Sequence, residues 1–287
     1  MKETAGTHVA TDGLRLFVRG WRPAGETRAA VLLVHGYAEH SGRYQHVATY
    51  LTGQGYAVHA MDLRGHGRSE GRRGYIGSYR TLLEDLDGYF RTVRGEHAGQ
   101  AHFVLGHSVG GALALLFAAQ HQEKLSGVIA SAAALSAGEA IPAYLIAAVR
   151  LLSRVAPRLP LIPLEAGTIS KDPAVQAAYD ADPLNYRGRV YARTGAQLLA
   201  LAEAARRAIP QISIPALVLH GGADSLIDPG GTEEIYGLLG SGDKTCRIYE
   251  GLYHEVFNEP EKEEVLREVG DWLGARLRPG GGHAAEG

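Results

Sequence analysis

The chain has 287 residues, a length that suits one sizeable α/β domain with an insertion. Hydrophobic residues make up 45% of it and charged residues 21%, a balance that excludes disordered and fibrous proteins. The formal net charge is -2, so no bulk basic field would recruit nucleic acid, and a single cysteine, Cys246, excludes an intrachain disulfide.

The N-terminal segment, Met1 to Gly13, is polar and lacks the apolar core of a signal peptide. The longest apolar run, Ala140–Val149, contains Pro142 and is too short to span a bilayer. We therefore expect a cytoplasmic protein, with any membrane contact made peripherally.

Short apolar, β-branched runs alternate with longer helical patterns along most of the chain. This alternation predicts the α/β class, with a mostly parallel central sheet flanked by helices. The expected strands are Leu14–Val18, Ala29–Val34, Ala57–Asp62, His102–Leu105, Gly127–Ser131, Ala216–Leu219 and Thr245–Tyr249. The expected helices are Tyr44–Gln54, Ser78–Gly95, Gly110–Gln120, Gly231–Leu239 and Pro260–Arg278.

One segment, residues 136–207, interrupts this alternation with helical and proline-punctuated sequence that shows no convincing strand. An insertion of this kind between two core strands predicts a helical cap. The core then consists of residues 1–135 and 208–278. The tail, residues 279–287, is rich in glycine and small residues and is expected to be disordered.

The first part of this cap, Glu139–Val155, has an amphipathic helical pattern that ends before Pro157. Arg150 and Arg154 fall opposite the apolar face. In most proteins the apolar face of such a helix packs on the core. The alternative is that part of this face is exposed on the surface. The apolar face consists of Ile141, Tyr144, Leu145, Ala148, Leu151, Leu152 and Val155.

The segment Gly106–Gly111 matches the pattern G-x-S-x-G around Ser108. It follows the expected strand His102–Leu105 and precedes a helical run, which is the strand, sharp turn and helix of a nucleophile elbow. Flanking glycines avoid collisions in this strained turn, and the helix N-terminus favours developing negative charge. A chance match in a chain with 38 glycines is the alternative, and the structural context argues against it. The pattern predicts an α/β-hydrolase fold with Ser108 as nucleophile.

A serine hydroxyl is a poor nucleophile unless a base takes its proton. In this fold the chain order is Ser, then Asp or Glu, then His, so only histidines after Ser108 qualify. His121 falls in the helix after the nucleophile, His220 precedes every plausible acid, and His283 lies in the tail. His254 lies in a loop between the last strand and the final helix, and we predict that it is the general base.

Two aspartates, Asp224 and Asp228, are candidates for the acid that orients His254. Asp224 lies in the turn that leaves the strand Ala216–Leu219, at the carboxyl edge of the expected sheet. Asp228 precedes Pro229, and Asp-Pro at the start of a helix is typical of an N-cap followed by the first helical residue. Helix capping accounts for Asp228, so we predict Asp224 as the acid.

The tetrahedral intermediate of acyl transfer needs two preorganised hydrogen-bond donors. We expect the backbone N–H of Val109 as one donor. The other is the N–H of Tyr37, in the turn after the strand Ala29–Val34. The alternative is that His35-Gly36 is merely a tight turn. No set of His, Cys and carboxylates has metal-site spacing, so no metal or cofactor is expected.

Four motifs resemble those of monoacylglycerol lipases and related lysophospholipase-like hydrolases. His35–Tyr44 resembles their HG-x-x-EHSGRY signature, Asp62–Ser69 their D-x-RGHG-x-S, Gly106–Gly111 their GHSMGG, and Tyr253–Glu255 their YHE. The resemblance extends from about Gly20 to Leu277. It departs at Val109, where the family usually has methionine, and at Tyr37, which is bulkier than the usual residue.

The resemblance implies hydrolysis of a monoacylglycerol to glycerol and a fatty acid without a cofactor. It also implies that Glu39 and Arg43 lie near the polar pocket for the glycerol head, whereas a surface ion pair is the alternative. The substrate would be a small lipid ester. If the apolar face of Glu139–Val155 is exposed, we expect it to form the entrance to the acyl tunnel and to contact the lipid interface.

Other functions compatible with this fold are a lysophospholipase, a general carboxylesterase, or a non-catalytic binding protein. An intact triad argues against the binding protein. No feature of the sequence indicates the acidic pocket of a peptidase, and epoxide hydrolases and dehalogenases use an aspartate where Ser108 stands.

Overall fold

The computed structural model describes residues 1–135, 142–163 and 169–277. Within them the main sheet has eight strands in the order β1-β2-β4-β3-β5-β6-β9-β10. The pairs β1–β2 and β2–β4 are antiparallel, and the remaining neighbours are parallel. The strands are β1 (Lys2–Val9), β2 (Arg15–Arg22), β3 (Ala29–Val34), β4 (Tyr56–Met61), β5 (Ala101–His107), β6 (Gly127–Ser131), β9 (Ala216–Gly221) and β10 (Lys244–Tyr249).

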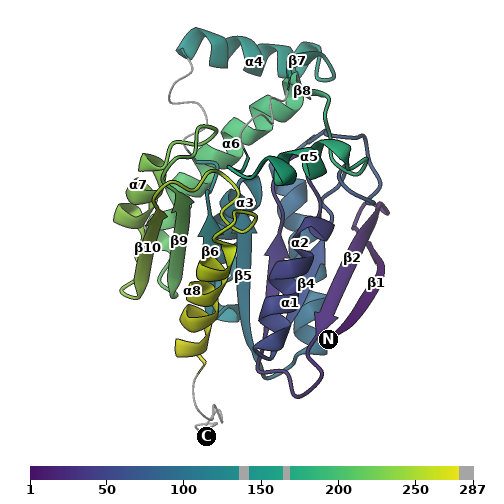
Figure 1. The fold of residues 1–287 in the computed structure, drawn as a ribbon. Coiled ribbons are helices and arrows are strands. Elements are labelled where there is room, and N and C mark those ends of the chain that lie inside the picture. Colours follow the sequence, from purple (N-terminus) through teal and green to yellow (C-terminus); the bar gives the residue numbers. More distant parts are fainter. Residues whose placement is uncertain (136–141, 164–168, 278–287) are drawn as a thin grey trace, which may run out of the picture.

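Helices cover both faces of this sheet (Figure 1). One face packs against α1 (Gln45–Gly53) and α8 (Lys262–Ala275), whose buried residues share a cluster with Val31, Leu105 and Leu219. The other face packs against α2 (Tyr79–Glu96), α3 (Val109–His121) and α7 (Gly230–Leu238). Strands β3, β4, β6 and β9 are buried at every position, which explains their apolar runs.

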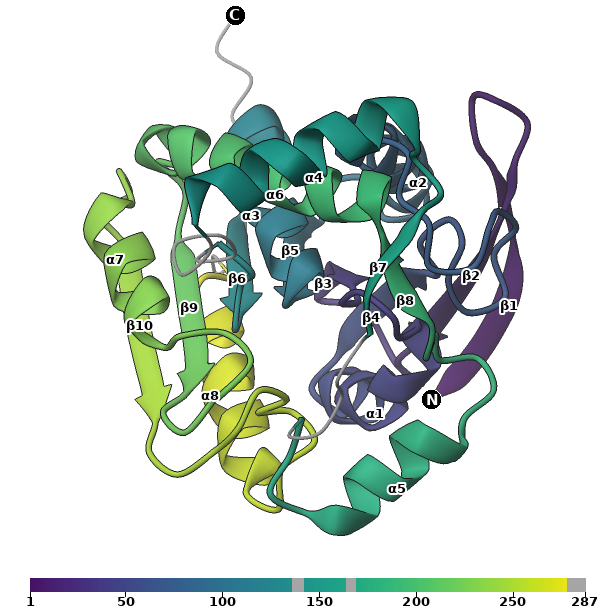
Figure 2. The same ribbon diagram turned by 90° about the horizontal axis from the view of Figure 1, so that it is seen from above.

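A cap lies above the carboxyl ends of the strands (Figure 1). It contains α4 (Ala143–Val155), α5 (Pro173–Ala181) and α6 (Ala192–Ala208). Seen from above, α4 runs along α6, and α5 lies on the opposite side of the cap (Figure 2). The cap is joined to the core by specific contacts, because the N–H of Tyr186 donates to the carbonyl of Ala38 and Arg73 donates to the carbonyl of Leu184.

The expectation of a cap without strands is wrong. β7 (Pro160–Pro163) and β8 (Arg189–Tyr191) form a small antiparallel pair within it. Both strands are short, and β7 begins and ends with proline, so neither carries the apolar alternation by which strands are recognised. The expected disordered tail and the cap residues Glu139 and Ile141 lie outside the described residues.

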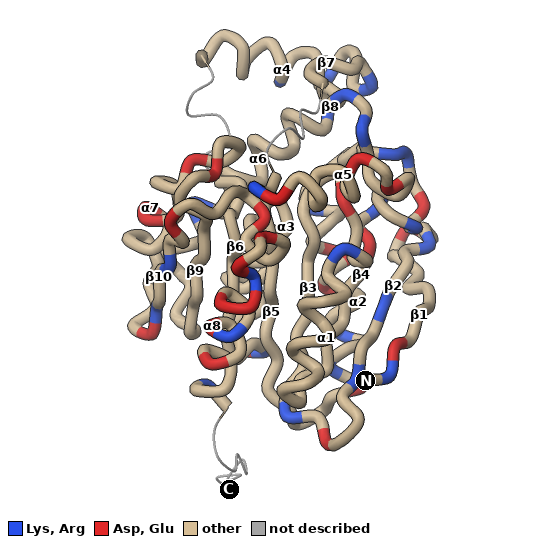
Figure 3. Tube along the Cα trace, in the orientation of Figure 1, with Lys and Arg blue, Asp and Glu red and all other residues tan. Residues whose placement is uncertain are grey.

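The apolar face of α4 is exposed rather than packed on the core. The exposed fraction is 71% for Tyr144, 58% for Leu151 and 71% for Val155. The opposite side of the helix faces α6, where Arg150 forms an ion pair with Glu203 and Ser153 is buried. The charged residues of α4 are Arg150 and, in its last turn, Arg154. The rest of the helix carries no charge (Figure 3). None of the helices in the described part of the chain is long and apolar enough to cross a membrane.

Candidate active site

Ser108 lies in a strained turn between β5 and α3. Its backbone has φ 54° and ψ −119°, a conformation that non-glycine residues adopt only where the surroundings enforce it. The flanking glycines make the turn sterically feasible. A Cβ on Gly106 would lie 2.1 Å from the carbonyl oxygen of Gly110, and a Cβ on Gly110 would lie 2.2 Å from that of Val34. This geometry presents the Ser108 side chain at the carboxyl end of the sheet.

Asp224 and His254 come from two different loops and meet at the same edge. Asp224 follows β9, and its Oδ2 lies 2.6 Å from His254 Nδ1. Its Oδ1 accepts hydrogen bonds from the N–H groups of Leu226 and Ile227. Burial would raise the pKa of Asp224, but hydrogen bonds from His220 and His254 outweigh burial and hold it far below its usual range. The carboxylate is therefore ionised and can orient the imidazole.

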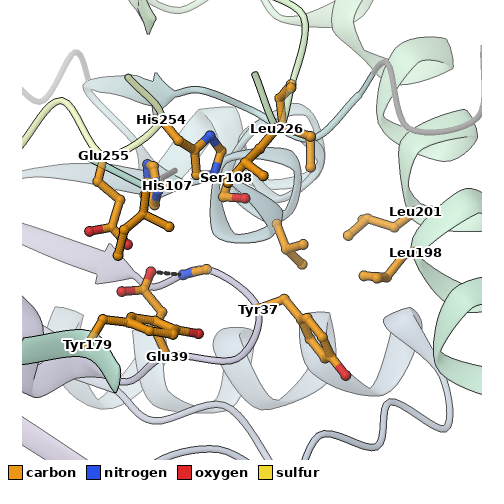
Figure 4. A pocket seen from close by; sticks show the side chains of 15 residues that line it. Tyr37, Glu39, His107, Ser108, Tyr179, Leu198, Leu201, Leu226, His254 and Glu255 are labelled. Atoms are coloured by element: carbon orange, nitrogen blue, oxygen red, sulfur yellow. Dashed lines mark hydrogen bonds between the residues drawn. The ribbon is translucent and has the colours of Figure 1, made fainter. Parts of the chain in front are cut away.

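Ser108 and His254 line one cavity and lie next to each other in Figure 4. Among the described residues no hydrogen bond joins the Ser108 hydroxyl to the His254 ring. In unliganded enzymes such a contact is commonly long and tightens when substrate binds. The His107 ring lies with its centroid 4.8 Å from that of His254 and forms one wall of the site.

Asp228 lies on the surface, at the start of α7. Its Oδ1 accepts a hydrogen bond from the N–H of Gly230 at 3.0 Å, and its side chain is exposed. The helix begins at Gly230, one residue after the position that the Asp-Pro pattern predicts. Asp228 thus stabilises a helix start, and Asp224 is the aspartate that contacts His254.

The two expected oxyanion donors, Tyr37 and Val109, both line the cavity. Val109 is the first residue of α3, so its N–H is among those that the helix itself leaves without a partner. The Tyr37 side chain turns away from Ser108, and its hydroxyl donates to the carbonyl of Gly74 at 2.7 Å (Figure 4). The bulk of Tyr37 is therefore accommodated outside the reaction centre.

Glu39 and Arg43 form a buried network with Glu255, the residue after His254. Arg43 donates to both oxygens of Glu255, at 2.5 and 2.6 Å, and to Glu39 Oε2 at 2.9 Å. Glu39 Oε1 accepts from the N–H of Gly36 at 2.6 Å and from the Tyr44 hydroxyl at 2.7 Å. Burial would raise the pKa of Glu39, but Arg43 and these partners lower it. The network is not the exposed ion pair considered as an alternative, because its three side chains are largely buried. It joins the turn at Gly36 to the His254 loop.

The cavity, of ≈ 250 Å³, has a polar and an apolar end. In Figure 4, Glu39, Glu255 and Tyr179 lie on one side of Ser108, and Leu198 and Leu201 lie on the other. The leucines belong to α6, so the cap supplies part of the apolar end. The full apolar lining consists of Val109, Ala134, Ile169, Leu198, Leu201, Leu226 and Ile227.

Three residues of this site were missed by sequence reasoning. His220 was set aside because it precedes the acid in the chain, yet its Nε2 lies 2.8 Å from Asp224 Oδ2. Glu255 is part of the Tyr253–Glu255 motif, and its charge next to His254 could have marked it. Tyr179 belongs to α5 of the cap, and the sequence carries no signal that places it beside Arg43.

Two groups of side chains bring potential metal-ligand atoms within 4.8 Å of one another, although their sequence spacing does not indicate a metal site. In the first group, His220 and His254 both hydrogen-bond Asp224. The second group joins a histidine of β4 to the C-terminal end of α2, and consists of His59, Glu96 and His97.

The fold and the site together define an α/β-hydrolase. A family model described as serine aminopeptidase, S33, matches residues 25–261, and the chain belongs to this family. It is 37% identical over 269 residues to the monoacylglycerol lipase of Mycolicibacterium smegmatis, covering 92% of this chain and 95% of that protein. It is 36% identical over 276 residues to the monoglyceride lipase of Homo sapiens, covering 95% and 91%.

Among solved structures, the monoacylglycerol lipase of Paleococcus ferrophilus superposes with a TM-score of 0.81 at 32% identity, covering 91% of this chain and 99% of that one. The expected fold class and the expected resemblance to monoacylglycerol lipases are confirmed. The chain is a carboxylic ester hydrolase.

Proposed function

We propose that the protein hydrolyses monoacylglycerols to glycerol and a free fatty acid, with Ser108, His254 and Asp224 as its catalytic triad. The observation that carries this proposal is the two-sided cavity around Ser108. A monoacylglycerol has one polar head and one acyl chain on either side of its ester bond. The polar end, with Glu39 and Glu255, suits the head, and the leucine-lined end suits the chain.

In the proposed reaction Ser108 Oγ attacks the ester carbonyl carbon while His254 Nε2 takes its proton. The N–H groups of Tyr37 and Val109 stabilise the oxyanion of the tetrahedral intermediate. The intermediate collapses, His254 returns the proton to the departing glycerol oxygen, and the acyl group stays on Ser108. Water then attacks the acyl carbonyl carbon while His254 takes its proton. The bond to Ser108 Oγ breaks, His254 returns the proton to that oxygen, and the fatty acid is released. Asp224 remains ionised and stabilises the imidazolium in both half-reactions.

We assign Glu39 and Arg43 to the polar head of the substrate. Glu39 lines the cavity, and its carboxylate can accept a hydrogen bond from a glycerol hydroxyl. Arg43 keeps that carboxylate charged and holds its second oxygen at 2.9 Å. Glu39 also binds the N–H of Gly36, so the same side chain links head-group recognition to the oxyanion turn.

A peptidase is the second hydrolase to consider, because the family name includes aminopeptidases. Two carboxylates, Glu39 and Glu255, line the cavity and could attract a free amine. Arg43 lies between them and makes ion pairs with both, which leaves the group with one net negative charge. The leucines at the other end match an acyl chain, and this favours the lipid ester.

We further propose that α4 docks on the lipid surface from which the substrate is drawn. Its exposed apolar side chains, Tyr144, Leu145, Leu151 and Val155, lie on one face. Two more exposed apolar residues, Leu159 and Ile162, follow directly after the helix. Exposed apolar side chains gathered on one face of a helix are typical of proteins that contact membranes.

The experiment that tests the function compares kcat/KM for monoacylglycerols, diacylglycerols, lysophospholipids, p-nitrophenyl esters and aminoacyl p-nitroanilides. We expect monoacylglycerols to be the best of these substrates. Fluorophosphonate labelling of the wild-type protein, lost in Ser108→Ala, identifies the nucleophile and excludes a non-catalytic binding protein. His254→Ala and Asp224→Asn should each lower kcat by about 10⁴-fold or more, and combining them should add little. Preference for lysophospholipids or anilides would refute the proposed substrate.

A further inference from the structure

A second histidine, His220, contacts the same carboxylate as His254. His220 lies near the end of β9, and its side chain is fully buried. Its Nε2 is 2.8 Å from Asp224 Oδ2, the oxygen that is also 2.6 Å from His254 Nδ1. One carboxylate oxygen thus accepts hydrogen bonds from two imidazoles.

The two hydrogen-bond partners of His220 indicate which of its ring nitrogens donates and which accepts. Its Nδ1 is 2.6 Å from the hydroxyl oxygen of Thr232, a buried residue of α7. An ionised carboxylate only accepts hydrogen bonds, so the Nε2 that faces Asp224 carries a proton. In the tautomer that carries its proton on Nε2, Nδ1 is an acceptor, and the Thr232 hydroxyl donates to it.

We propose that His220 is a positioning residue for the catalytic acid, and that Thr232, His220 and Asp224 form a relay that tunes His254. This inference rests on the proposed function, because it takes Asp224 and His254 as acid and base. The hydrogen bond from His220 fixes the rotation of the carboxylate. It also draws negative charge away from His254, because both rings bond the same oxygen of Asp224.

Other charged and titratable groups around His254 come from several elements. His107, at the end of β5, faces its ring, and burial, followed by the charge of His254, lowers the pKa of His107 to about 3. Glu255 forms an ion pair with Arg43 of the 3-10 helix Ser41–Tyr44, and Arg43 is shared with Glu39. Among these groups Asp224 is the one that hydrogen-bonds the His254 ring. A change at His220 therefore reaches His254 through Asp224.

The test uses two replacements of His220 and a matched control. His220→Phe keeps a ring of similar size and removes both hydrogen bonds. His220→Gln supplies an amide N–H close to the place of Nε2, so it can restore the bond to Asp224. The control is His59→Phe, because His59 is also a buried strand histidine, 3% exposed, whose Nε2 bonds His97 instead. For each variant kcat and KM on a water-soluble p-nitrophenyl ester are measured across pH, together with Tm.

We expect His220→Phe to lower kcat by about 10- to 100-fold, the loss of one hydrogen bond to a charged group, with little change in KM. The acid limb of its kcat/KM profile should move to higher pH. His220→Gln should recover most of kcat and the wild-type limb, and His59→Phe should change Tm alone. The inference is refuted if His220→Phe keeps the wild-type kcat and the wild-type acid limb of the kcat/KM profile. It is also refuted if His59→Phe lowers kcat as much as His220→Phe does.

Two further measurements separate this inference from the proposed function. The downfield proton NMR signal of His254 Nδ1–H reports on its bond to Asp224, and it should shift in His220→Phe whatever substrate the enzyme prefers. Thr232→Val preserves shape and removes the hydroxyl, so it should move that signal and the acid limb in the same direction, by less. An unchanged signal and limb in Thr232→Val would overturn the relay even if His220→Phe failed to fold.

Discussion

Replacing Leu151 with serine tests whether α4 contacts lipid, and the structure sets the size of the effect. Burying a whole leucine side chain is worth about 1.5–3 kcal/mol. Leu151 is 58% exposed, so less than half of that free energy contributes to folding. The free energy of unfolding should fall by about 1 kcal/mol or less, which lowers Tm by about 2–4 °C in a chain of this size.

The exposed remainder of the side chain is what a lipid surface could bury. It is worth about 1 kcal/mol, so Leu151→Ser should weaken binding to phospholipid vesicles about fivefold. Val155 is 71% exposed on the same face, and the double variant Leu151→Ser/Val155→Ser should lose about 25-fold. Hydrolysis of a water-soluble p-nitrophenyl ester should stay close to wild type in both, whereas hydrolysis of vesicle-bound monoacylglycerol should fall with binding.

A matched control lies on the opposite face of the same helix. Val149 is half-buried against Gly195 of α6, so Val149→Ser should lower Tm without selectively weakening vesicle binding. The measurements are vesicle co-sedimentation and thermal unfolding of all three variants. Equal vesicle binding by wild type and the double variant, or a loss of binding that only follows the loss of Tm, would refute lipid docking by this face.

Three further predictions concern the site and the turns that support it. Asp224→Asn should abolish ester hydrolysis while Asp228→Asn retains it, and the opposite result in a kcat assay would reassign the acid. Glu39→Gln still accepts the Gly36 N–H, so it should lower kcat/KM for a monoacylglycerol about tenfold more than for a p-nitrophenyl ester, whereas equal losses would assign Glu39 a purely structural role. Burial would raise the pKa of Asp62, but His35 and hydrogen bonds to its carboxylate lower it. The ionised carboxylate therefore stabilises the fold above about pH 4, and this stabilisation is lost as the pH falls further. Asp62→Asn should therefore be destabilised in urea at pH 7, and the gap to wild type should narrow as the pH falls below about 4; a gap independent of pH would contradict this.

The elements with a strong local signal could be predicted from the sequence. β3 and β6 have the bounds that their apolar runs indicate, because strands buried on both faces tolerate little else. β1 was missed because nearly all of its side chains are exposed and show no alternation. It exists through its antiparallel pairing with β2, a contact between segments that no short pattern records. The exposure of α4 was equally hidden, because amphipathicity shows that a helix has an apolar face and not what covers it.

In the site, too, the residues within a short motif could be predicted and those brought together by long-range contacts could not. Ser108 could be found because its strained turn requires small neighbours, and that requirement leaves a short, readable motif. The ion pair between Arg43 and Glu255 joins residues 212 positions apart, so no local pattern records it. His220 shows where the chain-order rule stops: the rule excludes it as the base, but order carries no information on which side chains face one carboxylate. β9 ends at Gly221, three residues before Asp224, so its last side chains lie close to that carboxylate. The position four residues before Asp224 is therefore a natural place for a side chain that contacts it.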